Sequence, residues 1–247
     1  KQGRAAIDKA RSAGFTNIGI DLIYGLPGQT ADDWRRDLDT AVEAAPEHLS
    51  CYLLTFEPGT RFDIRRRRGH LTPLDADTQA AHFQLTRRHL AAAGYPAYEV
   101  SNFACSTGPD GPDLRSRHNR KYWNHAPYLG LGPAAHSYRH PHRSWNVKRL
   151  KRYMEHLERG ERPLAASERL TTEQARVEAL YLALRQTRGL DTEWYAGRFG
   201  ESFESRYAAP LRDLIDGGRM VREGSVYRLT EAGFAVADGV VAYLLGA

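Results

Sequence analysis

The stretch GIDLIYGLPGQT at residues 19–30 decides how this chain folds. Its first half belongs to a run of β-branched and apolar residues over 16–24, and a cluster of Gly and Pro at 25–28 ends that run, which predicts a buried strand. Thr30 can cap a helix that starts directly afterwards, because Asp32 and Asp33 favour the positive first turn. Apolar residues recur through this helix at helical spacing, namely Trp34, Leu38 and Val42.

The same order repeats downstream. A second strand is predicted within 48–56, then an arginine-rich surface loop with the run 65–68, a helix over 75–93 and a third strand over 97–103. Strands and helices at these intervals predict a parallel sheet with right-handed crossovers. Because parallel strands need covered faces and edges, we expect further strands upstream. The opening, from Lys1, has the pattern of a helix already under way, so we expect the natural protein to begin earlier.

The second half of the chain has a different character. Residues 104–146 lack periodicity and are rich in Gly, Pro, His and aromatic residues, which is typical of an ordered, ligand-facing loop region. A helix is expected around 147–158. From residue 171 onward, helices followed by a hairpin across Glu223, Gly224 and Ser225 predict a small winged-helix-like domain. The predicted fold class is α/β, with domains 1–165 and 166–247.

Composition restricts the function classes. The net charge is +5, but residues 166–247 carry 10 Lys+Arg against 12 Asp+Glu, so the winged-helix-like part lacks the positive charge that DNA binding needs. We expect no nucleic-acid partner, and a solvated surface loop for the arginine run 65–68, with a phosphate-binding patch as the alternative. No apolar run reaches the ~20 residues of a membrane span, and the start lacks a secretory signal, which predicts a cytoplasmic protein. Cys51 and Cys105 are too few and too far apart for a disulfide scaffold or a thiolate metal site.

Asp21 interrupts the apolar strand. A buried carboxylate must be hydrogen-bonded or paired with a charge, so Asp21 is either a structural residue or a ligand-binding one. Ligands in parallel α/β folds gather at the carboxyl ends of strands, where the turn GLPGQ at 25–29 follows.

Five ordered motifs carry a resemblance to a known family. GIDLIYGLPGQT, LSCYLLTFEPGT, YEVSNFA, RHNRKYWNHAPYLGLGPAAHSY and LTEAGFAVADGVVAYLL resemble, from about residue 14 to the end, the HemW group of radical S-adenosylmethionine proteins. This group consists of haem chaperones related to oxygen-independent coproporphyrinogen III oxidase. The resemblance implies the C-terminal portion of a partial (β/α) barrel, followed by a helical domain of the type found at the C-terminus of the oxidase.

The resemblance also implies cofactors. The family binds S-adenosylmethionine and a [4Fe-4S] cluster, whose CxxxCxxC ligands lie upstream and are absent from this sequence, so the chain alone is not expected to be catalytically competent and its status as an enzyme stays open. Asp21, Thr55 and His136 match positions at which oxidase relatives contact S-adenosylmethionine. His136 replaces an apolar residue of the oxidase, and Thr55 lies in a divergent segment.

Haem is the third implied ligand, and the motif RHNRKYW at 117–123 supplies the candidates His118, Asn119, Tyr122 and Trp123. A neutral imidazole can ligate haem iron, aromatic rings offer flat faces, and Arg117 or Lys121 could pair with propionates. In the alternative interpretation, His118 and Asn119 only hydrogen-bond the loop to itself while Trp123 fills core. His125, His140 and His142 are further candidate ligands.

The leading hypothesis is therefore a haem chaperone that passes haem to an acceptor protein, for example a respiratory one. One alternative is an oxidase-like radical enzyme that decarboxylates coproporphyrinogen III. Another is a regulatory winged-helix protein with a degenerate barrel. The chaperone hypothesis depends on Asp21 and the region 118–136 converging at one open end of the barrel.

Overall fold

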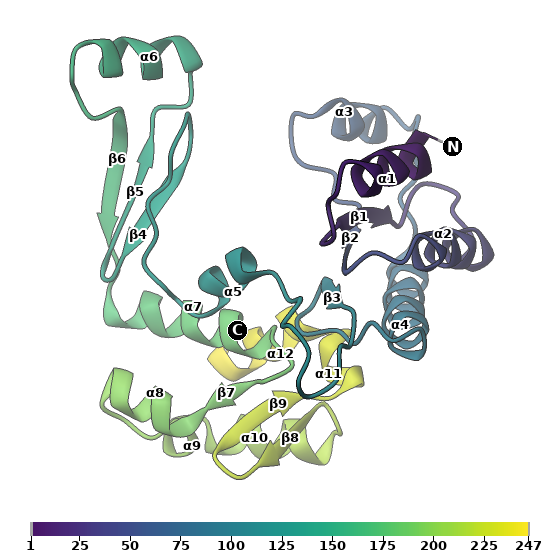
Figure 1. Ribbon diagram of the computed structural model, residues 1–247. Helices are drawn as coiled ribbons and strands as arrows, with labels where there is room; N and C mark the ends of the chain where they lie inside the picture. Colours follow the sequence, from purple (N-terminus) through teal and green to yellow (C-terminus); the bar gives the residue numbers. More distant parts are fainter. Residues whose placement is uncertain (1, 247) are drawn as a thin grey trace. The chain divides into compact units, whose positions relative to one another are not determined.

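The computed structural model describes residues 2–246 and divides into two compact units (Figure 1). Among the described residues, unit 1 comprises 2–116 together with 230–236, and unit 2 comprises 117–229 together with 237–246. This division lies elsewhere than the expected domain boundary at 165/166, which remains a prediction.

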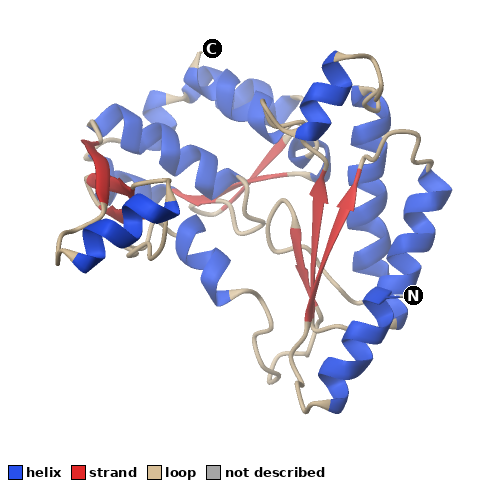
Figure 2. Ribbon diagram, turned by 90° about the horizontal axis from the view of Figure 1, so that it is seen from above, coloured by secondary structure: helices blue, strands red, loops and turns tan. Residues whose placement is uncertain are grey.

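Unit 1 is a three-stranded sheet with helices. The sheet order is β1-β2-β3, and one face of the strands carries helices (Figure 2). Its elements are α1 (Gln2–Ser12), β1 (Gly19–Tyr24), α2 (Ala31–Glu43), β2 (His48–Leu53), α3 (Arg61–Arg67), α4 (Ala76–Ala92), β3 (Asn102–Ala104) and α11 (Glu231–Phe234).

The core of unit 1 lies between the sheet and helices α2 and α4. Trp34 and Leu38 of α2 are at most 1% exposed and pack with Leu90 of α4 against the sheet residues Leu49 and Phe103. The indole of Trp34 donates to Thr86 Oγ1 at 2.8 Å, which satisfies its one polar atom inside the core. These are the apolar positions that the helical spacing in the sequence predicted.

The predicted strand–helix–strand order is confirmed for β1, α2 and β2, which pair in parallel with Asp21 opposite Ser50. The prediction of a third parallel strand over 97–103 is wrong. β3 runs antiparallel to β2, because the chain reverses at 98–101: Tyr98 N–H donates to Asn102 O at 3.1 Å, and Ala97 pairs with Phe103. The segment expected to be one strand is therefore a tight turn with a short strand after it.

Two further expectations for unit 1 need correction. The arginine run 65–68 is mostly helical, because Thr60 caps α3 and Asp63, 1% exposed, holds Arg66 and Arg67. The strand β1 is buried on one face only, so Asp21 is exposed instead of embedded in apolar surroundings. The run 16–24 looked continuous in sequence, but its side chains alternate between the core and solvent.

Unit 2 has two small sheets with helices. Its elements are α5 (Arg117–Trp123), β4 (His136–Arg139), β5 (His142–Asn146), α6 (Leu150–Glu158), β6 (Leu164–Arg169), α7 (Thr172–Leu184), β7 (Leu190–Asp191), α8 (Thr192–Phe199), α9 (Phe203–Arg206), α10 (Ala208–Asp216), β8 (Met220–Glu223), β9 (Val226–Leu229) and α12 (Ala237–Leu245). The strand orders are β4-β5-β6 and β7-β9-β8, with antiparallel pairing in both sheets.

The end of unit 2 has the winged-helix-like arrangement expected from sequence. Helix α7, strand β7, helices α8 to α10 and the hairpin β8–β9 follow in order, and the hairpin turns at Gly224 as predicted. Its core includes Leu180, Tyr195 and Phe203, all fully buried. The prediction that 104–146 lacks regular structure is wrong, because this range contains α5, β4 and β5.

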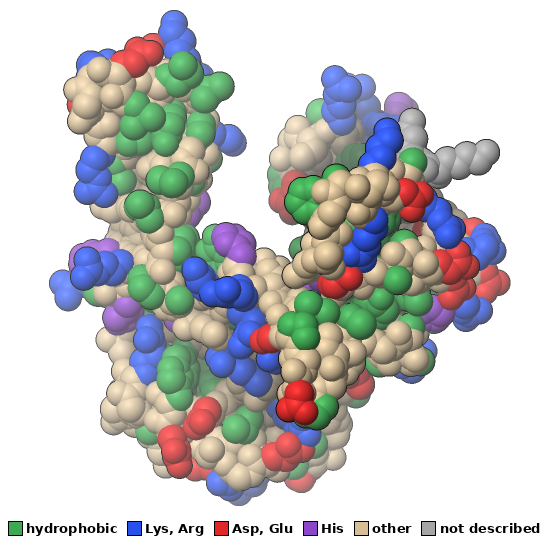
Figure 3. Space-filling view, viewed as in Figure 1, with side chains coloured by type: hydrophobic (Ala, Val, Ile, Leu, Met, Phe, Trp, Pro, Cys, Tyr) green, Lys and Arg blue, Asp and Glu red, His purple; other side chains and the backbone are tan. Residues whose placement is uncertain are grey.

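Strands β4 to β6 and helix α6 form a lobe of unit 2 with apolar side chains on its surface (Figure 3). α6 has no buried residue, although it carries apolar residues at helical spacing. The large exposed side chains here are Leu129, Leu131, Leu150, Met154, Leu157 and Leu164, between 42% and 80% exposed. No helix among residues 2–246 is long and apolar enough to cross a membrane.

Candidate functional site

The turn after β1 places the first candidate site at the carboxyl end of the strand. Gly25 has φ of +78°, a conformation that residues with a Cβ rarely adopt, and a Cβ there would also displace the Leu53 side chain, whose Cδ1 would lie 2.5 Å away. Gln29 Oε1 accepts from Gly25 N–H at 2.8 Å and closes the turn. Thr30 then caps α2 in a reciprocal capping box with Asp33, as the sequence predicted.

The sheet face that carries Asp21 is polar. Asp21 pairs in register with Ser50, and Ser50 with Asn102, so these three side chains form one row across the strands. Ser50 and Asn102 are 4% exposed, whereas Asp21 is open to solvent. His48, one row away, is already occupied, because its Nε2 lies 2.8 Å from the hydroxyl of Tyr98.

Thr55 and His136 lie on different elements from Asp21. Thr55 follows β2 in unit 1 and is exposed. His136 begins β4 in unit 2, is exposed and stacks on Trp145 with ring centroids 5.6 Å apart. The convergence of Asp21 with the region 118–136 therefore remains a prediction, since these residues belong to different units.

The loop before His136 is held by backbone contacts inside unit 2. Asn146 Nδ2 donates to the carbonyl oxygens of Gly130 and Gly132, at 3.3 and 3.0 Å. A Cβ at Gly130 would lie 2.0 Å from the carbonyl oxygen of His136, so glycine is required where the loop folds back on β4. The segment GLGPAAHS thus has a fixed shape.

The four haem candidates lie on α5. His118 is exposed and meets Tyr122 edge to face at 5.0 Å, and Asn119 is half-buried. Tyr122 in turn packs 4.7 Å from the ring of Tyr128. Trp123 is half-buried, and its carbonyl accepts from Gln186 Nε2 at 3.1 Å.

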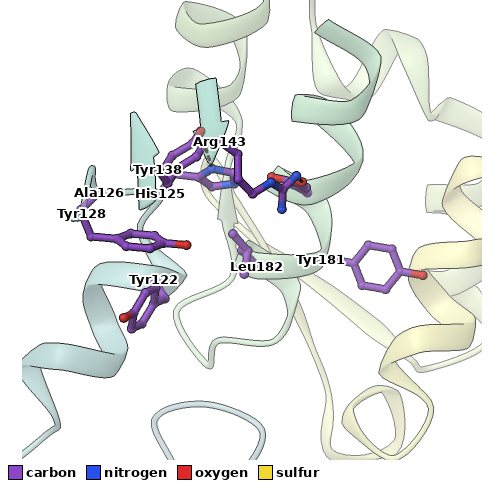
Figure 4. A pocket seen from close by; sticks show the side chains of 9 residues that line it. Tyr122, His125, Ala126, Tyr128, Tyr138, Arg143, Tyr181 and Leu182 are labelled. Atoms are coloured by element: carbon purple, nitrogen blue, oxygen red, sulfur yellow. Dashed lines mark hydrogen bonds and ion pairs between the residues drawn. The ribbon is translucent and has the colours of Figure 1, made fainter. Parts of the chain in front are cut away.

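Two pockets of about 340 Å³ each open beside α5, and both are lined by His125. The first is aromatic: Tyr122 and Tyr128 lie beside one another, with Tyr138, His125 and Arg143 beyond them (Figure 4). The second is lined by Trp123, Trp194 and Arg188. Sequence reasoning did not anticipate the contributions from α7, which are Glu178, Tyr181, Leu182, Ala179 and Ala183.

Charges at the pockets are only partly neutralised. Arg143 is paired with both Glu168 and Glu178. Arg188, by contrast, has a pKa lowered by burial and then by the neighbouring charge of Arg120. A carboxylate placed beside the Arg188 guanidinium would oppose both effects, so this position favours an anionic group.

Among the histidines near α5, His125 combines a lowered pKa with a buried ring nitrogen that has no hydrogen-bond partner among the described residues. Its Nδ1 lies 3.3 Å from the hydroxyl of Tyr138, and its Nε2 is buried with no hydrogen-bond partner among the described residues. Burial, followed by the charge of Arg198, lowers the pKa of His125. A neutral imidazole with one free buried nitrogen can coordinate a metal ion. His125 was only a further candidate in the sequence analysis, because a sequence does not reveal which ring nitrogen lacks a partner.

The two cysteines do not form a cluster site. Cys51 is buried in the sheet, where burial and then Asp21 raise the pKa of its thiol to about 12, and Cys105 is half-buried. No group of three or more His, Cys, Asp or Glu side chains suited to a metal occurs within residues 2–246. The described residues therefore do not fit a [4Fe-4S] cluster, which needs converging thiolates.

Comparisons with known proteins identify a matching domain family and similar sequences. The HemN C-terminal domain family matches residues 170–236. The heme chaperone HemW of Mycobacterium tuberculosis is 39% identical over 98% of this chain and 58% of its own length, and HemW of Bacillus subtilis is 32% identical over 98% and 62%. This chain thus spans about three fifths of the length of these relatives.

A solved structure shares the fold. The coproporphyrinogen III oxidase HemN of Escherichia coli, described as a radical SAM enzyme, superposes with a TM-score of 0.73 at 21% identity, over 98% of this chain and 57% of that one. The expected portion of a radical SAM α/β fold is thereby confirmed, and residues 2–246 contain no closed barrel. Taken together, these findings show that the chain matches the HemN C-terminal domain family over residues 170–236 and is similar to HemW over nearly its whole length.

Proposed function

We propose that this chain is the haem-binding part of a haem chaperone, which receives haem near residues 117–136 and passes it to an acceptor protein. The observation that carries the proposal is the 39% identity, over nearly the whole chain, to a protein named as a heme chaperone. A respiratory protein as acceptor and a cytoplasmic location belong to the same proposal. No nucleic acid is expected as a partner, since residues 166–247 are slightly acidic.

The geometry of unit 2 supports a planar, carboxylate-bearing ligand. Tyr122 and Tyr128 present aromatic rings beside the first pocket, and the guanidinium of Arg188 lines the second. Haem has a flat apolar ring and two propionates, so it complements both features. Asn119 and Trp123 would position α5, Trp123 through its carbonyl contact with Gln186.

Two histidines compete for the role of iron ligand. His118 is exposed on α5 and free to reach a ligand at the surface, whereas His125 is half-buried with an unpaired Nε2. We assign His118 as the ligand in the first instance, because it lies beside Tyr122 on the same helix. His125 is the replacement should that assignment fail.

A haemin titration of the full-length protein, purified anaerobically, tests this proposal. The wild type should give a Soret shift, His118→Ala should lose it, and His70→Ala, an exposed histidine of unit 1, should keep it. Loss in His125→Ala alone would transfer the ligand role to His125. A wild type without any Soret shift would refute haem binding.

S-adenosylmethionine and a [4Fe-4S] cluster are proposed for the complete protein. The polar sheet face with Asp21 fits the hydroxyl and amino groups of S-adenosylmethionine, and Thr55 and His136 are proposed as further contacts. The cluster would have its thiolate ligands outside this chain. When bound, the cluster supplies the electron that cleaves S-adenosylmethionine.

A second candidate function is an oxygen-independent coproporphyrinogen III oxidase. The fold shared with HemN favours it, although at 21% identity the likeness concerns the fold alone. Complementation of a strain that lacks the anaerobic oxidase would support this enzyme, and failure to complement would favour the chaperone. The winged-helix-like part could also bind DNA, and a titration without salt-dependent binding would exclude that alternative.

A further inference from the structure

The second pocket of unit 2 contains a positive charge that is not neutralised. Arg188 lines this pocket and forms no ion pair or hydrogen bond with the residues that the structure describes. The charge that acts on it is that of Arg120, which has the same sign. Asp191, which also lines the pocket, caps α8 instead: its Oδ1 accepts from the N–H groups of Glu193 and Trp194, at 2.8 and 3.4 Å. An anion in this pocket would therefore meet a guanidinium with free donors.

The first pocket has the opposite character. Its guanidinium, on Arg143, is paired with both Glu168 and Glu178 (Figure 4). Because Glu178 lines the same pocket, a carboxylate there would be repelled by a like charge. The rings of Tyr122 and Tyr128 lie 4.7 Å apart at this pocket and offer aromatic surface. The first pocket thus suits the uncharged, flat part of a ligand.

The remaining lining of the second pocket is apolar and small. Ala179 and Leu190 are 1% exposed, and Ala183 is 8% exposed, while Trp123 and Trp194 supply indole rings. The volume of about 340 Å³ lies near the lower end of the range of about 300–1,000 Å³ for ligand pockets. A single guanidinium among apolar side chains suits one carboxylate on an apolar body, whereas the phosphates of a nucleotide need several donors.

The turn after α7 fixes Arg188 beside α5. Gln186 is 5% exposed, and its Nε2 donates to the carbonyl of Trp123 at 3.1 Å, while its own carbonyl accepts from Gly189 N–H at 3.0 Å. Gly189 has φ of +74°, and a Cβ there would lie 2.2 Å from the carbonyl oxygen of Tyr227. Only glycine fits at this approach to β9. Arg188 is therefore held between two constrained residues.

The two pockets adjoin one another. His125 lines both of them, and the neighbouring residues Tyr122 and Trp123 of α5 line one pocket each. A ligand with a flat apolar ring and a carboxylate on a short chain can therefore occupy both, with its ring at the first pocket and its carboxylate in the second. Haem has this composition.

We propose that Arg188 binds a propionate of haem in the second pocket, while the haem ring lies against Tyr122 and Tyr128. The inference rests on the proposed function for the identity of the ligand. It adds the residue that recognises the carboxylate and the orientation of the ring. Arg188 was not a candidate from sequence, where Arg117 and Lys121 were named as propionate partners.

Titration of the full-length protein with haemin and with haemin dimethyl ester, whose carboxylates are blocked, tests the proposal. Quenching of tryptophan fluorescence reports binding, because Trp123 and Trp194 line the pocket. The wild type should bind haemin about tenfold or more tightly than the ester, since the hydrogen bonds of a guanidinium to a carboxylate have effects of this order. Arg188→Ala should bind haemin about tenfold or more weakly than the wild type and the ester within about twofold of it.

Two further variants sharpen the comparison. Arg212→Ala removes an exposed arginine of α10 that forms no ion pair with the described residues, and it should keep the wild-type preference for haemin. Arg188→Lys keeps the positive charge but loses the forked donor geometry, so it should retain only part of the preference.

Thermal unfolding without ligand separates binding from folding. Arg188→Ala should melt at the wild-type temperature or slightly above it, because the variant removes a guanidinium that Arg120 repels. Should Arg188→Ala unfold at a much lower temperature, Arg188→Gln, which keeps a polar side chain of intermediate length, replaces it in the titrations with the same expected result.

The outcomes distinguish this inference from the proposed function. If the wild type binds haemin and the ester equally well, or if the Arg188 variant keeps the wild-type preference for haemin, Arg188 does not bind a propionate, yet haem binding stands. An equal loss of affinity for both ligands in the variant would also overturn the inference. A wild type that binds neither ligand would refute haem binding and this inference together.

Discussion

At the scale of single residues, Asp63 shows how one buried carboxylate organises a surface helix. It accepts from Gly59 N–H at 3.0 Å and pairs with Arg66 and Arg67 at 2.8 and 3.0 Å. The hydrogen bond from Arg66, followed by the one from Gly59, lowers the pKa of Asp63 to about 2. The arginine run that suggested a solvated loop is helical because this residue neutralises part of it.

Asp63→Asn should therefore lower the stability of the protein at pH 7. An Asp that titrates near 3.9 when unfolded and about 2 when folded contributes fully above about pH 5 and loses its contribution as the pH falls toward 2. Urea unfolding at pH 7, 5 and 3 should show a wild-type advantage that is equal at pH 7 and 5 and smaller at pH 3. Asp8→Asn, an exposed residue of α1, should show no such trend, and a trend equal to that of Asp63→Asn would contradict the assignment.

Leu38 provides a test of the core of unit 1. It is fully buried between α2 and the sheet, so Leu38→Ala should reduce the free energy of unfolding by about 2–5 kcal/mol through lost burial and the cavity left behind. Leu129→Ala, at a side chain that is 75% exposed, should change it by less than about 0.5 kcal/mol. Denaturant melts of both variants check this. Similar losses of stability in the two variants would show that Leu38 does not lie in the core.

Expectations for single residues were confirmed where a sequence pattern, such as apolar helical spacing or a capping position, is compatible with only one structural role. Trp34 and Leu38 were expected in the core from their spacing, and Thr30 as a cap from its position before an acidic turn, and both hold. Asp21 was expected to be buried and is exposed, because an apolar run in sequence does not tell whether one or both faces of a strand are covered. The unpaired nitrogen of His125 depends on neighbours far away in the sequence and leaves no local signal.

At the scale of elements, the start of α2 depends on its capping box. Thr30→Ala removes the acceptor for Asp33 N–H and should cost about 1 kcal/mol of stability. The exposed Thr16, which precedes β1, gives the control Thr16→Ala with little expected change. Thermal unfolding of both variants measures the difference. Equal melting temperatures would show that the start of α2 does not depend on the Thr30 cap.

The elements that sequence missed have a common cause. β3 is only three residues long, and its direction is set by the turn at 98–101, while β4, β5 and β6 form a separate antiparallel sheet with few buried apolar residues. Short strands without a buried apolar face have no strong periodicity. The helices α2, α4 and α7 were predictable because their caps and apolar spacing are local.

At the scale of the whole molecule, a salt bridge joins segments 144 residues apart. Arg87 on α4 is 5% exposed, and its Nε and Nη2 donate to Glu231 at 2.6 and 2.7 Å, while its guanidinium lies 4.4 Å from the ring centroid of Phe234. The hydrogen bonds from Arg87 lower the pKa of Glu231. This pair fixes the segment 230–236 to the rest of unit 1.

Glu231→Ala should destabilise the protein by about 2–3 kcal/mol, because it leaves a buried guanidinium without its carboxylate. The effect is smaller than for a fully buried pair, since Glu231 itself is 69% exposed. Glu223→Ala breaks a surface pair with Arg228 and should cost less than about 1 kcal/mol. Urea melts of both variants compare them, and equal losses would show that Arg87 is solvated once its partner is removed.

The placement of the segment 230–236 in unit 1 determines which truncation variants can fold. The stretch matched by the HemN C-terminal domain, 170–236, includes these seven residues, yet spatially they belong with residues 1–116. A polypeptide cut after Ser116 would keep Arg87 but not Glu231 or Phe234, and one that starts at Arg117 would carry Phe234, 4% exposed in the intact chain, with nothing from α4 to cover it. Neither piece should behave as an independent folding unit. Truncations based on the matched range 170–236 should therefore yield partly unfolded, aggregation-prone products.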